Sequence, residues 1–100
     1  MSGTERSARL RVFLPQGLRP FAGGAATVEW EQPEAPLSEV LMALWERHPA
    51  LRDRIFSEDG RWRPHVRMFV GSEDVRWTGD LATRVPEGAE ITIVPAVSGG

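Results

Sequence analysis

The sequence of 100 residues predicts an α+β fold in which one main helix packs on a mixed sheet of four to five strands. Two observations predict it. One segment has apolar residues at helical spacing, and the segments on either side alternate in the way that is typical of strands with one buried face. Their order is two strands, the helix and then three strands. Because one amphipathic helix and one sheet can cover each other's apolar faces, we expect two layers.

Two strands are expected before the helix. Residues 10–14 alternate so that one face is entirely apolar, and Pro15 ends this strand. Residues 20–26 contain a Gly-Gly pair and are expected to form a loop or turn. Residues 27–31 (TVEWE) alternate again. The two strands together predict a hairpin.

The helix is expected to start with Pro36 in its first turn, where a missing N–H has little effect, and to stop at Pro49. Its apolar side chains recur at intervals of three and four residues and so form one stripe. The stripe consists of Leu37, Val40, Leu41, Leu44, Trp45 and His48. Residues 51–55 are expected to add a further short turn.

Three strands are expected after the helix, following a polar loop over residues 57–64. They cover residues 66–70, 73–76 and 90–95, and residues 81–83 form an irregular or single-turn segment between the last two. Helix and sheet would enclose a core to which the strands contribute Leu10, Val12, Val28, Trp30, Val66, Met68, Ile91 and Ile93. This is the β-grasp, or ubiquitin-like, arrangement. We expect residues 1–95 to form the domain, with 1–8 disordered, and 96–100 to form a flexible tail.

Composition excludes several classes of protein. The net charge of −2 argues against a nucleic-acid binder with a broad basic surface. There is no cysteine, so disulfides, thiolate nucleophiles and cysteine metal sites are absent. His48 and His65 lack a second ligand at metal spacing, and we expect no metal site, no bound cofactor and no catalytic residue. Without a signal-peptide pattern or a long apolar run, a cytoplasmic location is expected.

The last residues carry the strongest functional signal. The chain ends in Ser98-Gly99-Gly100, five residues past the expected end of the last strand at Pro95. Extended, five residues span at most about 17 Å, which is enough to enter another protein's active site. Glycines pass through a narrow channel and leave the terminal carboxylate open. A terminal Gly-Gly arises by chance in roughly 0.5% of chains, so it carries weight only together with the fold.

A family resemblance adds to this reading. The stretch FVGSEDVRWTGDLATRVPEGAEITIVPAVSGG, which ends at Gly100, resembles the C-terminal third of ThiS/MoaD-family sulfur carrier proteins, above all actinobacterial carriers of cysteine biosynthesis. RLRVFLPQGLRPF is similar to their first strand, whereas residues 26–63 match only in pattern. Ser98 departs from the small residues or threonine often seen in relatives.

The resemblance implies a β-grasp fold and a function as a protein co-substrate without an active site. An E1-like enzyme would use ATP to adenylate the carboxylate of Gly100, which would then become a thiocarboxylate. Gly99, Ser98 and Val97 would lie in the enzyme's channel. The implied partners are the E1-like enzyme, a sulfur-accepting synthase such as a PLP-dependent cysteine synthase, and a metalloprotease that releases the product.

A docking face is expected on the side of the sheet opposite the helix. Phe13, Phe69 and Val94 fall on the strand sides that face away from the expected core. Exposed apolar clusters often mark interaction sites, and the resemblance implies that family members meet the activating enzyme there. Alternatively, some of these side chains belong to the core or are covered by the 57–64 loop.

The sequence is also compatible with other functions. The same thiocarboxylate could serve thiosugar, thiamine or molybdopterin synthesis. A ubiquitin-like modifier that forms isopeptide bonds with lysines also requires a terminal Gly-Gly. A third alternative is an inert β-grasp binding module, for which the two glycines would have no role.

Overall fold

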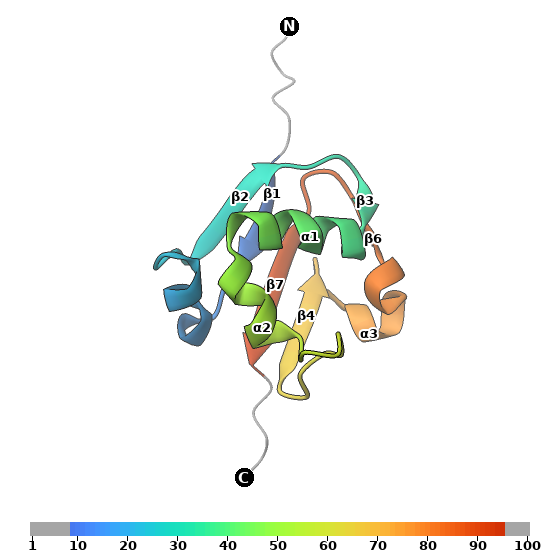
Figure 1. Ribbon diagram of the computed structural model, residues 1–100. Helices are drawn as coiled ribbons and strands as arrows, with labels where there is room; N and C mark the ends of the chain where they lie inside the picture. Colours follow the sequence, from blue (N-terminus) through green and yellow to red (C-terminus); the bar gives the residue numbers. More distant parts are fainter. Residues whose placement is uncertain (1–8, 96–100) are drawn as a thin grey trace, which may run out of the picture.

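Five strands form one mixed sheet in the order β2-β1-β7-β4-β5 (Figure 1). The computed structural model describes residues 9–95. The strands are β1 (Arg9–Phe13), β2 (Thr27–Glu31), β4 (Val66–Val70), β5 (Glu73–Asp74) and β7 (Glu90–Pro95). The central pair β1–β7 is parallel and the other neighbouring pairs are antiparallel. The α+β class and the mixed sheet predicted from the sequence are therefore confirmed.

One face of the sheet is covered by α1 (Leu37–Arg47) and the short helices that follow it (Figure 1). Pro36 is the N-cap residue rather than part of the first turn, and the Leu37 N–H donates to the carbonyl of Thr83 at 2.8 Å. Pro49 stops the helix as predicted and begins η3 (Pro49–Leu51), which runs into α2 (Arg52–Ile55). Because Leu51 and Ile55 are fully buried, this extra turn extends the helical layer.

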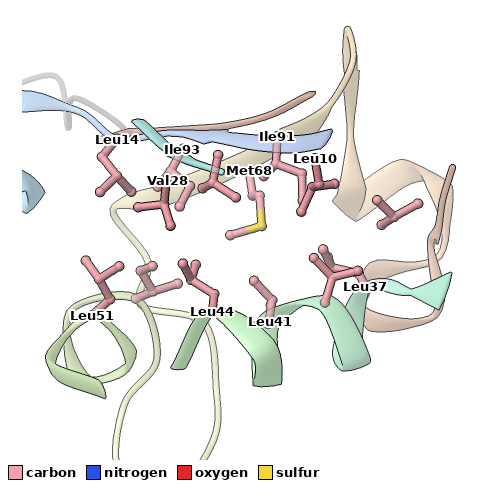
Figure 2. Packing of buried hydrophobic residues seen from close by; sticks show 14 of the residues in the cluster. Leu10, Leu14, Val28, Leu37, Leu41, Leu44, Leu51, Met68, Ile91 and Ile93 are labelled. Carbon is pink, nitrogen blue, oxygen red and sulfur yellow. The ribbon is translucent and has the colours of Figure 1, made fainter. Parts of the chain in front are cut away.

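The core lies between α1 and the sheet (Figure 2). Leu37, Val40, Leu41 and Leu44 form its helical side and are at most 2% exposed. Its sheet side consists of Leu10, Val12, Val28, Trp30, Met68, Ile91 and Ile93, all buried. Burying each large side chain contributes about 1.5–3 kcal/mol, so this cluster is the main source of stability. Trp45, His48 and Val66, placed on the same faces by the sequence, are only half-buried.

The expected strand over residues 73–76 is wrong in its second half. Pairing stops at Asp74, and the chain turns into α3 (Val75–Thr78). Asp74 is the reason, because one of its carboxylate oxygens accepts a hydrogen bond from the Arg76 N–H at 2.9 Å. Such an N-cap satisfies a backbone donor at the start of a helix and favours a helical turn over continued pairing.

Other local elements were not predicted. The expected loop before β2 contains a 3-10 helix, η2 (Gln16–Ala22), which ends at Gly23 in the left-handed conformation with φ of 66°. A second, two-stranded sheet pairs β3 (Ala35–Pro36) with β6 (Arg84–Val85). By contrast, the irregular or single-turn segment expected over residues 81–83 is present as a single 3-10 turn, η4 (Asp80–Ala82). These elements have no apolar periodicity because turn chemistry and tertiary contacts form them.

Candidate functional site: the end of β7 and the open sheet face

β7 brings the chain to the candidate site from the centre of the sheet. It lies between β1 and β4 and ends at Pro95, which is exposed and lies across from Val66. The predicted tail residues Val97, Ser98, Gly99 and Gly100 lie outside the described residues, so their roles remain predictions. The structure does fix the point from which the last five residues start. That point is the end of a strand that pairs with β1 as far as Thr92 and with β4 as far as Pro95.

The three residues predicted to form a docking face lie on the side of the sheet opposite α1. Phe13 on β1 and Phe69 on β4 both lie directly across from Thr92, which is on β7 between them. Val94 lies two residues further along β7, on the same face and next to the point where the chain leaves the sheet. All three side chains are half-buried. They therefore form an apolar patch beside the tail exit, named here the open-face patch, and its role in docking stays a prediction.

A cluster of charged residues borders the open-face patch. Asp74 on β5 lies across from Phe69, and its carboxylate is only 5% exposed. One of its oxygens accepts hydrogen bonds from the guanidinium groups of Arg67 at 3.0 Å and Arg76 at 3.2 Å. Arg67 in turn lies across from Val94. The sequence shows three charged residues here but not that one buried carboxylate holds both arginines.

The charge state of this cluster follows from its contacts. Burial by itself raises the pKa of Asp74, because it disfavours the charged form. The backbone N–H of Arg76 and the two guanidinium groups act in the opposite direction, and they hold the pKa at about 2. Asp74 is therefore ionised at neutral pH, and the cluster carries one net positive charge because two arginines share one carboxylate.

The opposite end of the same face has more acidic than basic side chains. Arg9 and Arg11 lie 3.5 and 3.6 Å from Glu29, and Arg11 also lies 3.7 Å from Glu90. Exposed ion pairs of this kind contribute about 0–1 kcal/mol each. With Glu31, which lies across from Arg9, this end has two arginines and three glutamates, whereas the end at the tail exit has an excess of arginine. The charge of this face therefore changes along the strands, from acidic at the far end to basic at the tail exit.

The loop over residues 57–64 does not cover the open-face patch. Its Trp62 donates a hydrogen bond to Asp80 at 2.6 Å, and its ring centroid lies 4.7 Å from that of buried Phe56. Phe56 in turn contacts Trp45 of α1 edge to face at 5.9 Å. These contacts tie the loop to the helical layer and give Trp62, unassigned from the sequence, a structural role.

The remaining candidates provide no other site. His48 is half-buried and His65 is exposed, and within residues 9–95 no three His, Cys, Asp or Glu side chains gather as metal ligands would. Trp77 is 79% exposed on α3, and nothing in the structure explains its exposure. In the same described range, no helix has both the length and the apolar character needed to cross a membrane.

The chain is similar to proteins of a known family. The model of the ThiS family matches residues 12–100. The sulfur carrier protein CysO of Mycobacterium tuberculosis is 35% identical over 91 residues, which cover 89% of this chain and 96% of that protein. Small archaeal modifier protein 1 of Haloferax volcanii is 33% identical over 67 residues, covering 67% of this chain and 72% of that protein.

The fold is shared with a solved complex. The crystal structure of the Amycolatopsis orientalis BexX/CysO complex contains a chain that superposes with a TM-score of 0.79 and 32% identity, covering 91% of this chain and 99% of that one. The relatives named here are carrier or modifier proteins, and one of them is part of a complex with another protein. The β-grasp prediction is confirmed, and the chain belongs to the ThiS family of sulfur carrier proteins.

Proposed function

We propose that this chain carries sulfur as a thiocarboxylate on Gly100 and donates it in a biosynthetic reaction, most directly cysteine synthesis. The observation that carries the proposal is the family match, which runs through Gly99 and Gly100. The strand end at Pro95 supports it, because the matched glycines are the fourth and fifth residues after a strand that pairs with β4 up to its last residue. The chain itself is a co-substrate rather than a catalyst.

The chemistry requires a partner that uses ATP. The carboxylate of Gly100 attacks the α-phosphorus of ATP, pyrophosphate leaves, and an acyl-adenylate forms. A sulfur nucleophile held by the partner then attacks the acyl carbon, and AMP leaves. When that nucleophile is hydrosulfide, the new C–S bond replaces the C–O bond to AMP and the S–H proton is lost, so the terminus is a thiocarboxylate directly and no cysteine of this chain is needed. The partner is an E1-like adenylating enzyme, and ATP binds to that enzyme.

As the recipient of the sulfur we propose a PLP-dependent cysteine synthase, with a metalloprotease that releases the finished amino acid from the carrier. The similarity to the sulfur carrier protein CysO supports the carrier function on which this part of the proposal rests. Carriers for thiosugar, thiamine or molybdopterin synthesis would use the same terminal chemistry. Purified synthases of each type, supplied with the thiocarboxylate form, would separate these pathways by the product formed.

A second candidate function is protein modification. The similarity to small archaeal modifier protein 1 favours it, since a modifier would join the same carboxylate to lysine side chains. Incubation with ATP, sulfide and the adenylating enzyme, followed by intact mass measurement, separates the two. The exchange of one oxygen for sulfur supports the carrier, and a ladder of lysine conjugates supports the modifier. Deletion of Gly99 and Gly100 abolishes either product, whereas a matched deletion of Ser2 and Gly3 abolishes neither.

A further inference from the structure

A hollow of about 430 Å³ lies directly beside the tail exit. Its walls are η2, which contributes Leu18 and Phe21, and α2, which contributes Arg54. Val66 at the start of β4 and Pro95 at the end of β7 close it on the sheet side. Because Pro95 is part of the lining, the five residues that follow it start at the rim of this hollow.

The lining combines apolar surface with unneutralised positive charge. Leu18, Phe21 and Val66 are half-buried, so part of each apolar side chain remains accessible. The guanidinium carbon of Arg54 lies 4.4 Å from the centroid of the Phe21 ring, and the Nε of Arg63 donates to the carbonyl of Asp53 at 2.7 Å. These two contacts hold both arginines at the hollow.

Neither arginine is neutralised by an acidic neighbour. Among the ion pairs of residues 9–95, none includes Arg54 or Arg63. The one carboxylate in the lining, that of Asp53, lies 3.4 Å from Arg52 instead. Two guanidinium groups therefore face this hollow without an acidic partner, and in a protein partner the carboxylates of Asp and Glu are the groups that a guanidinium binds through two parallel hydrogen bonds.

We propose that the hollow is a docking site for a segment of the adenylating enzyme that carries a large apolar side chain flanked by Asp or Glu. The apolar side chain would fill the space between Leu18, Phe21 and Val66, and the acidic neighbours would pair with Arg54 and Arg63. The proposal rests on the proposed function. An active site that takes up Gly100 lies within about 17 Å of Pro95, which brings the enzyme surface against the hollow.

This site extends the open-face patch rather than repeating it. Val94 lines the hollow and also belongs to the patch, so one partner can contact both surfaces continuously. The patch provides apolar contact on the face opposite α1, and the hollow adds charge-dependent contact on the side of η2 and α2. Charged contacts of this kind mainly determine partner choice and association rate, and they weaken with salt.

The test measures steady-state thiocarboxylate formation with the purified adenylating enzyme, ATP and sulfide. In the double variant Arg54→Glu/Arg63→Glu we expect KM for the carrier to rise tenfold or more, while kcat at saturation changes less than twofold. Arg54→Gln/Arg63→Gln should give an intermediate KM, and Arg54→Lys/Arg63→Lys should retain most of the wild-type affinity. The matched control is Arg84→Glu, an exposed arginine of β6 outside the hollow.

The outcomes separate the two proposals. If wild-type carrier forms no thiocarboxylate, the proposed function fails. If wild-type carrier is converted and the charge-reversed variant has the KM of the Arg84→Glu control at low salt, the docking site is refuted. Circular dichroism of each variant checks that the fold is intact. Leu18→Glu is an independent second variant: it places on the apolar lining a negative charge that would repel the acidic residues proposed for the enzyme, and we expect the same rise in KM.

A competing occupant is the chain's own C-terminal segment. In that case, amide chemical shifts of Leu18 and Phe21, which lie on η2 and not on the strand that pairs with Pro95, would change in the free protein when residues 96–100 are deleted. That result, in the absence of any enzyme, would overturn the docking proposal. We expect those shifts to stay unchanged on deletion and to move when the enzyme is added.

Discussion

The guanidinium carbon of Arg67 lies 5.7 Å from the centroid of the Phe69 ring, two residues further along β4. A cation at this distance from an aromatic ring is attracted to it. The same guanidinium is hydrogen-bonded to Asp74, so the arginine is held from two sides. The open-face patch therefore has a fixed positive edge, and its apolar and charged parts can be tested separately.

The apolar part is tested by Phe69→Ala. Truncating a residue at the centre of an interface often weakens the binding free energy by more than about 1 kcal/mol. We therefore expect the dissociation constant of the complex with the adenylating enzyme to rise about tenfold. Calorimetric titration measures it. Met42→Ala, an exposed apolar residue of α1 in the helical layer, is the control and should bind like the wild type. Equal affinity of both variants would remove Phe69 from the interface.

The charged part is tested by the pH dependence of stability. The pKa of Asp74 is lowered from 3.8 to about 2 in the folded chain. Its charge therefore stabilises the fold fully above about pH 4, and this contribution, on the order of 2 kcal/mol, is lost as the pH falls from there toward 2. Asp74→Asn keeps a capping side chain but removes the charge.

Urea unfolding between pH 2 and 7 measures this contribution. We expect the free energy of unfolding of Asp74→Asn to lie below that of the wild type at pH 7 and to approach it near pH 2. A constant gap between the two proteins over the whole range would show that the charge of Asp74 does not stabilise the fold.

The core is tested by Leu44→Ala. Leu44 is fully buried between α1 and the sheet (Figure 2), and truncation of such a side chain costs about 2–5 kcal/mol through lost burial and a residual cavity. Met42→Ala on the exposed side of the same helix should change stability by less than about 0.5 kcal/mol. Chemical denaturation of both variants gives the comparison, and similar losses in the two would contradict the two-layer packing.

The turn after α3 is tested by Gly79→Ala. The backbone of Gly79 has a φ of 122°, and a Cβ there would lie 3.4 Å from the backbone nitrogen of Thr83. A residue other than glycine in such a backbone conformation lowers the free energy of unfolding by about 1–3 kcal/mol. At Gly17, where a Cβ meets nothing within 4 Å and φ is not positive, the same change should have little effect. The difference in melting temperature between the two variants checks this prediction.

Much of the fold was predictable because its main elements bury periodic apolar faces. The stripe of α1 and the alternation of β1, β2, β4 and β7 determine which side chains meet in the core, and the structure agrees with the sequence there. The same alternation placed Phe13 and Phe69 on the opposite face. Because burial of one face makes apolar residues recur at a regular spacing, this pattern can be recognised in the sequence alone.

The parts that could not be predicted depend on contacts between distant residues. The end of β5 at Asp74 is set by a capping hydrogen bond, and capping residues in short turns leave no periodic signal. The hollow beside Pro95 is formed by η2, α2 and two strand ends, which are far apart in the sequence. Its two arginines, Arg54 and Arg63, are nine residues apart, and only the fold shows that they share one surface with η2 and the end of β7.

The most direct measurement is the mass of the C-terminal peptide of the carrier after incubation with ATP, sulfide and the adenylating enzyme. The proposed function predicts that one oxygen is replaced by sulfur and that fragmentation places the sulfur on Gly100. An unmodified Gly100 in a reaction that consumes ATP, or a peptide joined to lysine instead, would contradict it.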